Sequence, residues 1–176
     1  MNAPEFWLRG PVPGVPALLQ PVARALLQAR TEVNALMAGF PEARLWDRPA
    51  GLASAGFHLQ HLAGVLDRLF TYADGRALSR QQLADLAAEG RPFPGAGTAG
   101  EALTRFNSMI DNVLLQLDGF ETSGLTDVRE VGRDRMPSTV IGLLVHAAEH
   151  TMRHTGQLLV TVRILGVGGD SGNRGE

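Results

Sequence analysis

TVIGLLVHAAEHTMRHTGQLLVTVRIL, the run from Thr139 to Leu165, decides the fold because it has the pattern of one long amphipathic helix. Its apolar and histidine positions recur at steps of three and four residues, which places them on one face of an α-helix. That face contains Leu143, His146, His150, His154, Leu158, Thr161 and Leu165. The preceding Ser138 is a suitable N-cap, so the sequence predicts a helix over residues 139–165.

Three earlier segments show the same helical spacing of apolar residues. They cover about residues 19–40, 54–73 and 98–120. Ser54 is a plausible N-cap for the second segment, and Thr98 with Glu101 has the spacing of a capping box for the third. The sequence therefore predicts four long amphipathic helices.

The segments between these helices differ in length. Residues 74–97 form a long connection in which Ser79 and Gln82 predict a capped short helix that ends near Ala88. A connection of this length suits a crossover and not a tight hairpin. Residues 121–137 are polar and show no convincing strand alternation. We therefore expect an all-α protein, a four-helix bundle with a long crossover between its second and third helices.

The two ends of the chain have a different composition. Residues 1–16 contain four prolines, which predicts an extended N-terminal arm. Residues 17–166 hold the helical segments and are expected to form one domain. Residues 167–176 are rich in glycine and are expected to form a flexible tail.

Composition excludes several classes of function. The chain has 176 residues, a formal net charge of -2 and no cysteine. A charge this small gives no field that favours nucleic acid or an anionic membrane. Without cysteine, a bound metal must use histidine, carboxylate or water. No apolar run is long enough to span a membrane and no signal peptide is visible, so we expect a cytoplasmic protein.

All five histidines lie in two of the four long helices: His58 and His61 in the second, and His146, His150 and His154 in the fourth. They replace apolar residues on the inward faces. A buried imidazole left without a hydrogen-bond partner costs about 1–3 kcal/mol. One such histidine is an ordinary core residue, but five on facing stripes favour a divalent cation that takes neutral imidazole nitrogens as ligands.

Helix geometry limits which histidines share one ion. His146 and His154 are two turns apart, about 12 Å along the axis, so the fourth helix offers either His146 with His150 or His150 with His154. The second helix offers His58 or His61. Three imidazoles leave a coordination position for water or substrate, which is typical of catalytic metal sites.

His146-Ala147-Ala148-Glu149-His150 also matches H-x-x-E-H, the inverted zinc-protease signature. Such proteases need a carboxylate ligand well downstream, and here the chain ends soon after the motif. We therefore interpret Glu149 as a neighbour of the ligands or a surface residue.

Several motifs together resemble the DinB/YfiT-like superfamily of metalloenzymes. His150-Thr151-Met152-Arg153-His154-Thr155-Gly156-Gln157 is similar to its H-x-x-x-H-R-G-Q signature, and residues 55–63 resemble its earlier histidine motif. Residues 133–140 resemble the stretch that leads into its last helix. The resemblance covers essentially the whole chain, and it departs at Thr155, where arginine is usual.

The resemblance implies an up-down-down-up bundle, commonly a homodimer, with His61, His150 and His154 as metal ligands. Four neighbours, His58, His146, Glu149 and Arg153, then contact the ligands or the substrate. Zn or Ni is the expected ion, and Fe, Co and Mn also suit the site. Characterised members of the family resemble transferases and isomerases that use a low-molecular-weight thiol such as glutathione, mycothiol or bacillithiol.

The leading hypothesis is therefore a metal-dependent S-transferase that joins a small thiol to a small electrophile. Arg68 and Arg153 are candidates for binding cosubstrate carboxylates, although solvated surface positions are the more frequent outcome for arginine. Two alternatives stay open. One is hydrolysis by water activated at the metal, with Glu149 or Asp67 as base. The other is a metal-binding stress-response or sensor protein without turnover.

Overall fold

The computed structural model describes residues 4–166 and consists mainly of helices. The five α-helices are α1 (Gln20–Met37), α2 (Ala55–Ala73), α3 (Arg80–Ala88), α4 (Ala99–Asp118) and α5 (Val140–Ile164). Two strands, β1 (Val128–Val131) and β2 (Met136–Thr139), form an antiparallel hairpin. Short 3-10 turns lie at Phe6–Leu8, Ala17–Leu19, Glu42–Arg44, Pro49–Gly51 and Thr122–Gly124.

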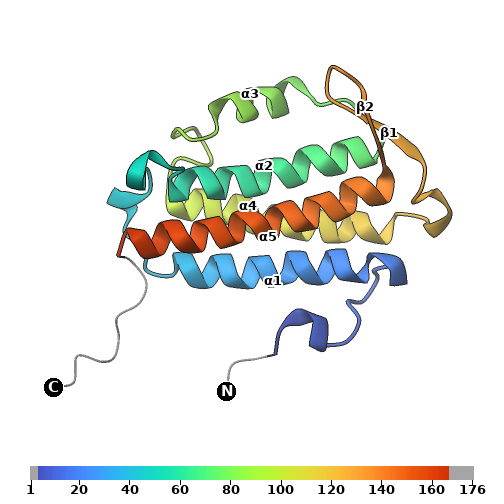
Figure 1. Ribbon diagram of the computed structural model, residues 1–176, viewed down its shortest axis with the longest axis horizontal. Helices are drawn as coiled ribbons and strands as arrows, with labels where there is room; N and C mark the ends of the chain where they lie inside the picture. The colour runs from blue at the N-terminus through green and yellow to red at the C-terminus, as the bar shows by residue number, and fades with distance from the viewer. Residues whose placement is uncertain (1–3, 167–176) are drawn as a thin grey trace.

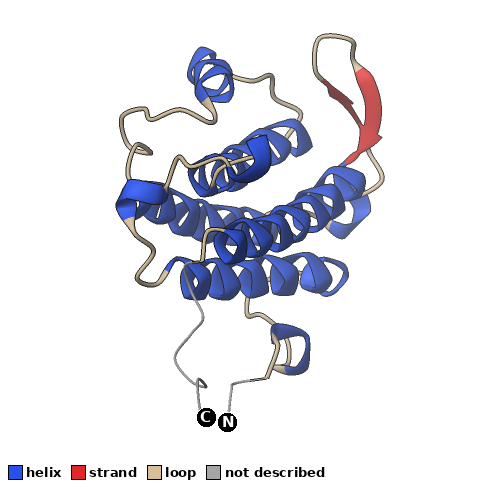
Figure 2. Cartoon of the chain, turned by 60° about the vertical axis from the view of Figure 1, so that its left-hand side comes forward, coloured by secondary structure: helices blue, strands red, loops and turns tan. Residues whose placement is uncertain are grey.

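The four long helices pack as a bundle. α2 packs against α4 and α5, and α1 packs against the same two helices. Figure 1 shows the chain passing through α1 and α5 in one direction and through α2 and α4 in the other. The connection that carries α3 returns the chain along the outside of α2 (Figures 1 and 2). This packing places the inward face of α2 directly against that of α5.

One apolar core joins the four long helices. Its largest fully buried side chains include Leu26 of α1, Leu62 and Phe70 of α2, Phe106 of α4 and Leu158 of α5. Burial of a side chain of this size contributes about 1.5–3 kcal/mol, so these contacts fix the rotation of each helix. The polar positions on the same faces, including His58 and His61, are thereby held at defined places in the bundle.

Helix starts largely agree with the caps expected from the sequence. The side chains of Ser54, Ser79 and Thr98 each accept a hydrogen bond from the first turn of their helices, and the last two complete capping boxes. The expected cap at Ser138 is wrong by one residue. The side chain of Thr139, the last residue of β2, instead accepts a hydrogen bond from the backbone N–H of Gly142.

The hairpin corrects the expectation of an all-α protein. Residues 121–137 were expected to be an irregular loop, yet Val128 pairs with Thr139 and Val131 with Met136. Each strand has only four residues, two exposed and two partly buried, so no run of alternating apolar residues marks them in the sequence. The Arg129 side chain fixes the hairpin to the bundle, because its Nε donates to the carbonyl of Ala73 at 2.8 Å.

The N-terminal segment lies against α1. Within residues 4–16 the chain has the 3-10 turn Phe6–Leu8, and the backbone N–H of Phe6 donates to Gln28 Oε1 at 3.1 Å. Gln20 donates to the carbonyls of Val12 and Val15. The tail expected to be flexible, residues 167–176, lies outside the described residues. Among the described helices, none is both long and apolar enough to cross a membrane.

Candidate metal centre

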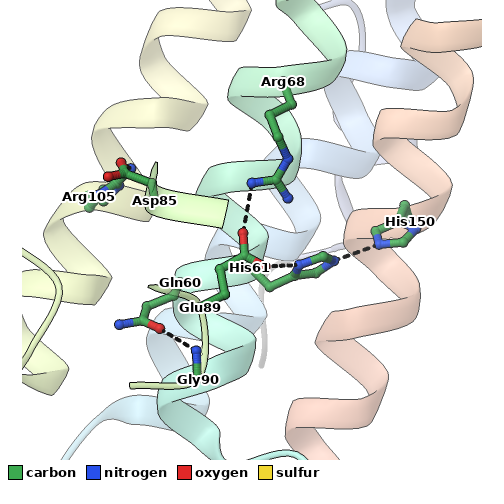
Figure 3. Close-up of polar contacts among 8 residues, drawn as sticks. All are labelled: Gln60, His61, Arg68, Asp85, Glu89, Gly90, Arg105 and His150. Carbon is green, nitrogen blue, oxygen red and sulfur yellow. Dashed lines mark hydrogen bonds and ion pairs between the residues drawn. The ribbon is translucent and has the colours of Figure 1, made fainter. Parts of the chain in front are cut away.

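Three of the five histidines converge between α2 and α5. His61 of α2 and His150 and His154 of α5 each offer a ring nitrogen within 4.8 Å of the other two. His150 and His154 are one turn apart on α5, and the packing of α2 on α5 brings His61 opposite them. Figure 3 shows His61 and His150 pointing toward each other across the interface of the two helices.

The donor set fits a divalent cation. Two imidazole ligands of a tetrahedral Zn²⁺, each about 2.1 Å from the ion, lie roughly 3.4 Å apart. The Nε2 atoms of His61 and His150 are 2.9 Å apart, and the three nitrogens together stay within 4.8 Å. Borderline ions such as Zn²⁺ or Ni²⁺ suit three imidazoles. The cluster could therefore hold a metal ion with a position left over for another ligand.

Glu89, which the sequence analysis missed, fixes the orientation of His61. It follows α3 directly, and its Oε2 lies 2.7 Å from His61 Nδ1 while its Oε1 lies 2.7 Å from Arg68 Nη1. The carboxylate accepts a hydrogen bond from the Nδ1–H of His61, which leaves Nε2 of this ring as a bare acceptor toward His150. Figure 3 shows this chain of contacts from Arg68 through Glu89 to His61 and on to His150.

Charge keeps Glu89 ionised although it is almost fully buried. Burial by itself raises the pKa of this carboxyl, but the hydrogen bond from His61 and the charge of Arg68 outweigh it and hold the pKa below its usual value. Arg68 is itself buried. It is therefore neither a surface arginine nor free to bind a cosubstrate carboxylate, because its guanidinium neutralises Glu89.

Backbone contacts hold Glu89 in place. The side chain of Gln60 accepts from the backbone N–H of Gly90 at 2.9 Å and donates to the carbonyls of Arg91 and Ala96 at 2.9 and 2.8 Å. Gly64 of α2 makes room for the ion pair, since a Cβ there would lie 2.7 Å from both Arg68 Nη1 and Glu89 Oε1. One side of α2 thus binds the backbone of the connection after α3 through Gln60 and leaves space for the carboxylate of Glu89 at Gly64.

His58 supports the cluster from one turn earlier on α2. Its Nδ1 lies 3.1 Å from Nδ1 of His154, so one of the two rings donates to the other. His58 is only 3% exposed. Burial, and then the nearby His61, lower its pKa to about 4. Nδ1 of a neutral His58 can accept a hydrogen bond from Nδ1–H of His154, which would leave Nε2 of His154 free for a ligand role.

The two α5 members of the cluster are also neutral at physiological pH. Burial first, and the proximity of His61 second, lower the pKa values of His150 and His154 to about 4. Only the neutral imidazole has a lone pair for a metal. Phe57 shields one side of the cluster, with its ring stacked on His61 at a centroid distance of 5.3 Å.

The remaining expected neighbours lie on the exposed side of α5. His146 Nδ1 is 2.8 Å from Glu149 Oε1, and Arg153 donates to the same oxygen at 3.1 Å. All three side chains are about half exposed. The His146 ring is 5.3 Å from that of His150, outside the three-histidine cluster. The carboxylate of Glu149 is committed to these two partners, so the structure gives no support to the protease-like role.

Fold and site together define a helical-bundle protein with a three-histidine cluster that could hold a metal. The chain belongs to the DinB superfamily, whose sequence profile matches residues 25–158. The fold resembles that in the crystal structure of a conserved protein from Enterococcus faecalis, with a TM-score of 0.67 and 19% identity over 84% of this chain and 96% of that one. No curated protein matches the sequence.

Proposed function

We propose that this protein is a metal-dependent enzyme that conjugates a low-molecular-weight thiol to a small electrophile. The observation that carries the proposal is a cluster of three donors among the described residues, His61, His150 and His154, whose nitrogens lie within 4.8 Å of one another. Three neutral ligands leave the double charge of Zn²⁺ or Ni²⁺ uncompensated and a position vacant. A bound cation would lower the pKa of a thiol at that position and so keep it a thiolate at neutral pH.

Residues around the cluster orient the imidazole rings that would bind the cation. Glu89 and His58 hold the rings of His61 and His154 by hydrogen bonds, so that their lone pairs are aimed before the cation binds. Phe57 covers His61 and limits the access of water from that side. In the reaction the thiol sulfur forms a bond with the electrophilic carbon. With an aryl halide the carbon–halogen bond breaks, and halide and the thiol proton leave to solvent; with an activated alkene the π bond breaks and the neighbouring carbon takes up one proton, so that no group leaves.

The absence of cysteine supports a thiol that comes from a cosubstrate. No thiol of the protein itself can compete for the cation or be modified by the electrophile. Hydrolysis has less support, because it needs an uncommitted base near the ion. The carboxylates near the cluster, Glu89 and Glu149, both have hydrogen-bond partners among the described residues.

The test is a conjugation assay with protein loaded with Zn²⁺ or Ni²⁺. Glutathione, mycothiol and bacillithiol are each combined with an aryl halide or an activated alkene, and the thioether product is measured by mass spectrometry. We expect product with at least one thiol, and none after chelation or in His154→Ala. A metal-loaded protein that forms no thioether with any of the thiols would contradict the proposal and favour a sensor that only binds metal.

A further inference from the structure

A cavity beside the histidine cluster has the dimensions of a ligand site. It encloses about 460 Å³ between the loop before α2 and the C-terminal half of α5. Small-molecule sites in proteins usually fall between about 300 and 1,000 Å³. The residues that matter for its chemistry are Leu52, His58, Arg153, Gln157, Val160 and Ile164.

The cavity is polar at one end and apolar at the other. Arg153, Gln157, Val160 and Ile164 follow one another at steps of four, three and four residues, so they line one face of α5. From Arg153 to Ile164 this face is about 16 Å long. Leu52, Val160 and Ile164 are each more than half exposed, although they are large and apolar. A ligand with an apolar body would cover this surface.

The polar end is the end next to the metal cluster. His58 lines the cavity and contacts His154 through its Nδ1 at 3.1 Å, so a ligand against His58 is one side chain away from the cluster. Among the described residues that line the cavity, Arg153 is the only arginine, lysine or carboxylate side chain. A positive charge at the polar end favours an anionic group on the ligand.

Gly156 gives a second and independent indication. It lies in the interior of α5 with helical backbone angles, where glycine costs about 1 kcal/mol relative to alanine. A Cβ at this position would meet nothing within 4 Å, so close packing does not require glycine. It lines the cavity. The missing side chain leaves open the space between Arg153 and Val160.

We propose that this cavity binds the electrophilic substrate, and that the substrate is a small amphiphile with an apolar body and an anionic group that pairs with Arg153. This inference rests on the proposed function for the reaction, but the binding site stands on the cavity alone. Glu149 shares the guanidinium of Arg153 at 3.1 Å. The carboxylate of the ligand therefore competes with Glu149 for this guanidinium.

The test uses 4-phenylbutyrate as the probe and 4-phenylbutanol as its uncharged counterpart, titrated by NMR into the chelated and the metal-loaded full chain. We expect the acid to bind more tightly than the alcohol to wild-type protein. Gly156→Leu should weaken both probes by roughly tenfold or more, because leucine fills the cavity while favouring the helix. Gly100→Leu in α4, another helical glycine whose Cβ would meet nothing, is the matched control and should bind as wild type.

Variants of the charged pair test the anionic group. Arg153→Gln should weaken the acid roughly tenfold through loss of one charge-assisted hydrogen bond and leave the alcohol unchanged, whereas Glu149→Gln should strengthen the acid. Equal affinity for wild type and Gly156→Leu, no preference for the acid, or no binding at millimolar probe would overturn the proposal. Probe binding to chelated protein without thiol conjugation by metal-loaded protein would contradict only the proposed function.

Discussion

Replacement of Glu89 by glutamine should weaken metal binding and destabilise the chelated protein. The two oxygens of Glu89 serve different donors, His61 through Oε2 and Arg68 through Oε1, each at 2.7 Å. A glutamine has one carbonyl oxygen and can serve only one of them. Its NH₂ group then faces the other donor, so one contact is lost and replaced by a repulsive one.

The magnitude follows from these two contacts. Loss of a hydrogen-bond partner behind a metal-bound histidine usually costs about 10–100-fold in metal affinity, or roughly 1.4–2.8 kcal/mol. Loss of the countercharge leaves Arg68, which is 8% exposed, as a buried unpaired cation. Breaking a buried ion pair in this way costs about 3–5 kcal/mol of the free energy of unfolding.

Two measurements separate these effects. Competition with a coloured chelator gives the dissociation constant for Zn²⁺, and urea unfolding of the chelated protein gives its stability. Glu149→Gln is the matched control, because Glu149 also joins a histidine to an arginine, but on an exposed surface where such pairs contribute about 0–1 kcal/mol. We expect both quantities to stay near wild-type values in this control.

A double variant protects the test against simple misfolding. Glu89→Gln with Arg68→Met removes the stranded charge, so it should recover part of the stability while the affinity for Zn²⁺ stays low. A folded Glu89→Gln protein that binds Zn²⁺ within twofold of wild type would refute the orienting role of Glu89.

Two further predictions concern the histidines. His154→Ala should lose its metal on dialysis, because two imidazoles hold a divalent ion weakly. His146→Ala, on the exposed side of α5, should keep its metal. Elemental analysis that finds equal metal in both variants would rule out the ligand set. The chelated protein should lose stability as pH falls from about 6.5 to 4, because the unfolded chain takes up protons on His58, His150 and His154 that the folded chain, with pKa values of about 4, does not. For His58 the loss between pH 7 and 5 is at most about 2 kcal/mol, and urea unfolding curves that coincide at these two pH values would contradict it.

Local signals explain why the helices could be predicted. Steps of three and four residues and the side chains of Ser54, Ser79 and Thr98 act within one or two helical turns, and the structure shows them as expected. The hairpin depends instead on pairing between two strands of four residues with little buried surface. Such pairing leaves no pattern in the sequence that distinguishes it from a loop.

The same distinction applies to the candidate site. The convergence of His61, His150 and His154 follows from the packing of two helices whose apolar faces must meet. Residue spacing alone therefore limited which histidines could share one ion. Spacing did not separate His146 from His154 as the partner of His150, because that depends on how α5 is rotated in the core. Glu89 reaches His61 across 28 positions of the sequence and only because a loop is held against α2, a contact that no periodicity encodes.

Gln60 binds three backbone groups of the α2–α4 connection, those of Gly90, Arg91 and Ala96. These contacts divide the connection into segments that should differ in how well they tolerate a change in length. Residues 74–79, which precede α3, are largely exposed and lie before these contacts, so extra residues there would lengthen a surface loop at an entropic cost that grows only slowly with its length. Between Gly90 and Ala96 the spacing is set by one amide side chain. Relatives of this chain should therefore differ freely in length before the short helix, and those with an insertion after it should lack the glutamine, the glutamate or both.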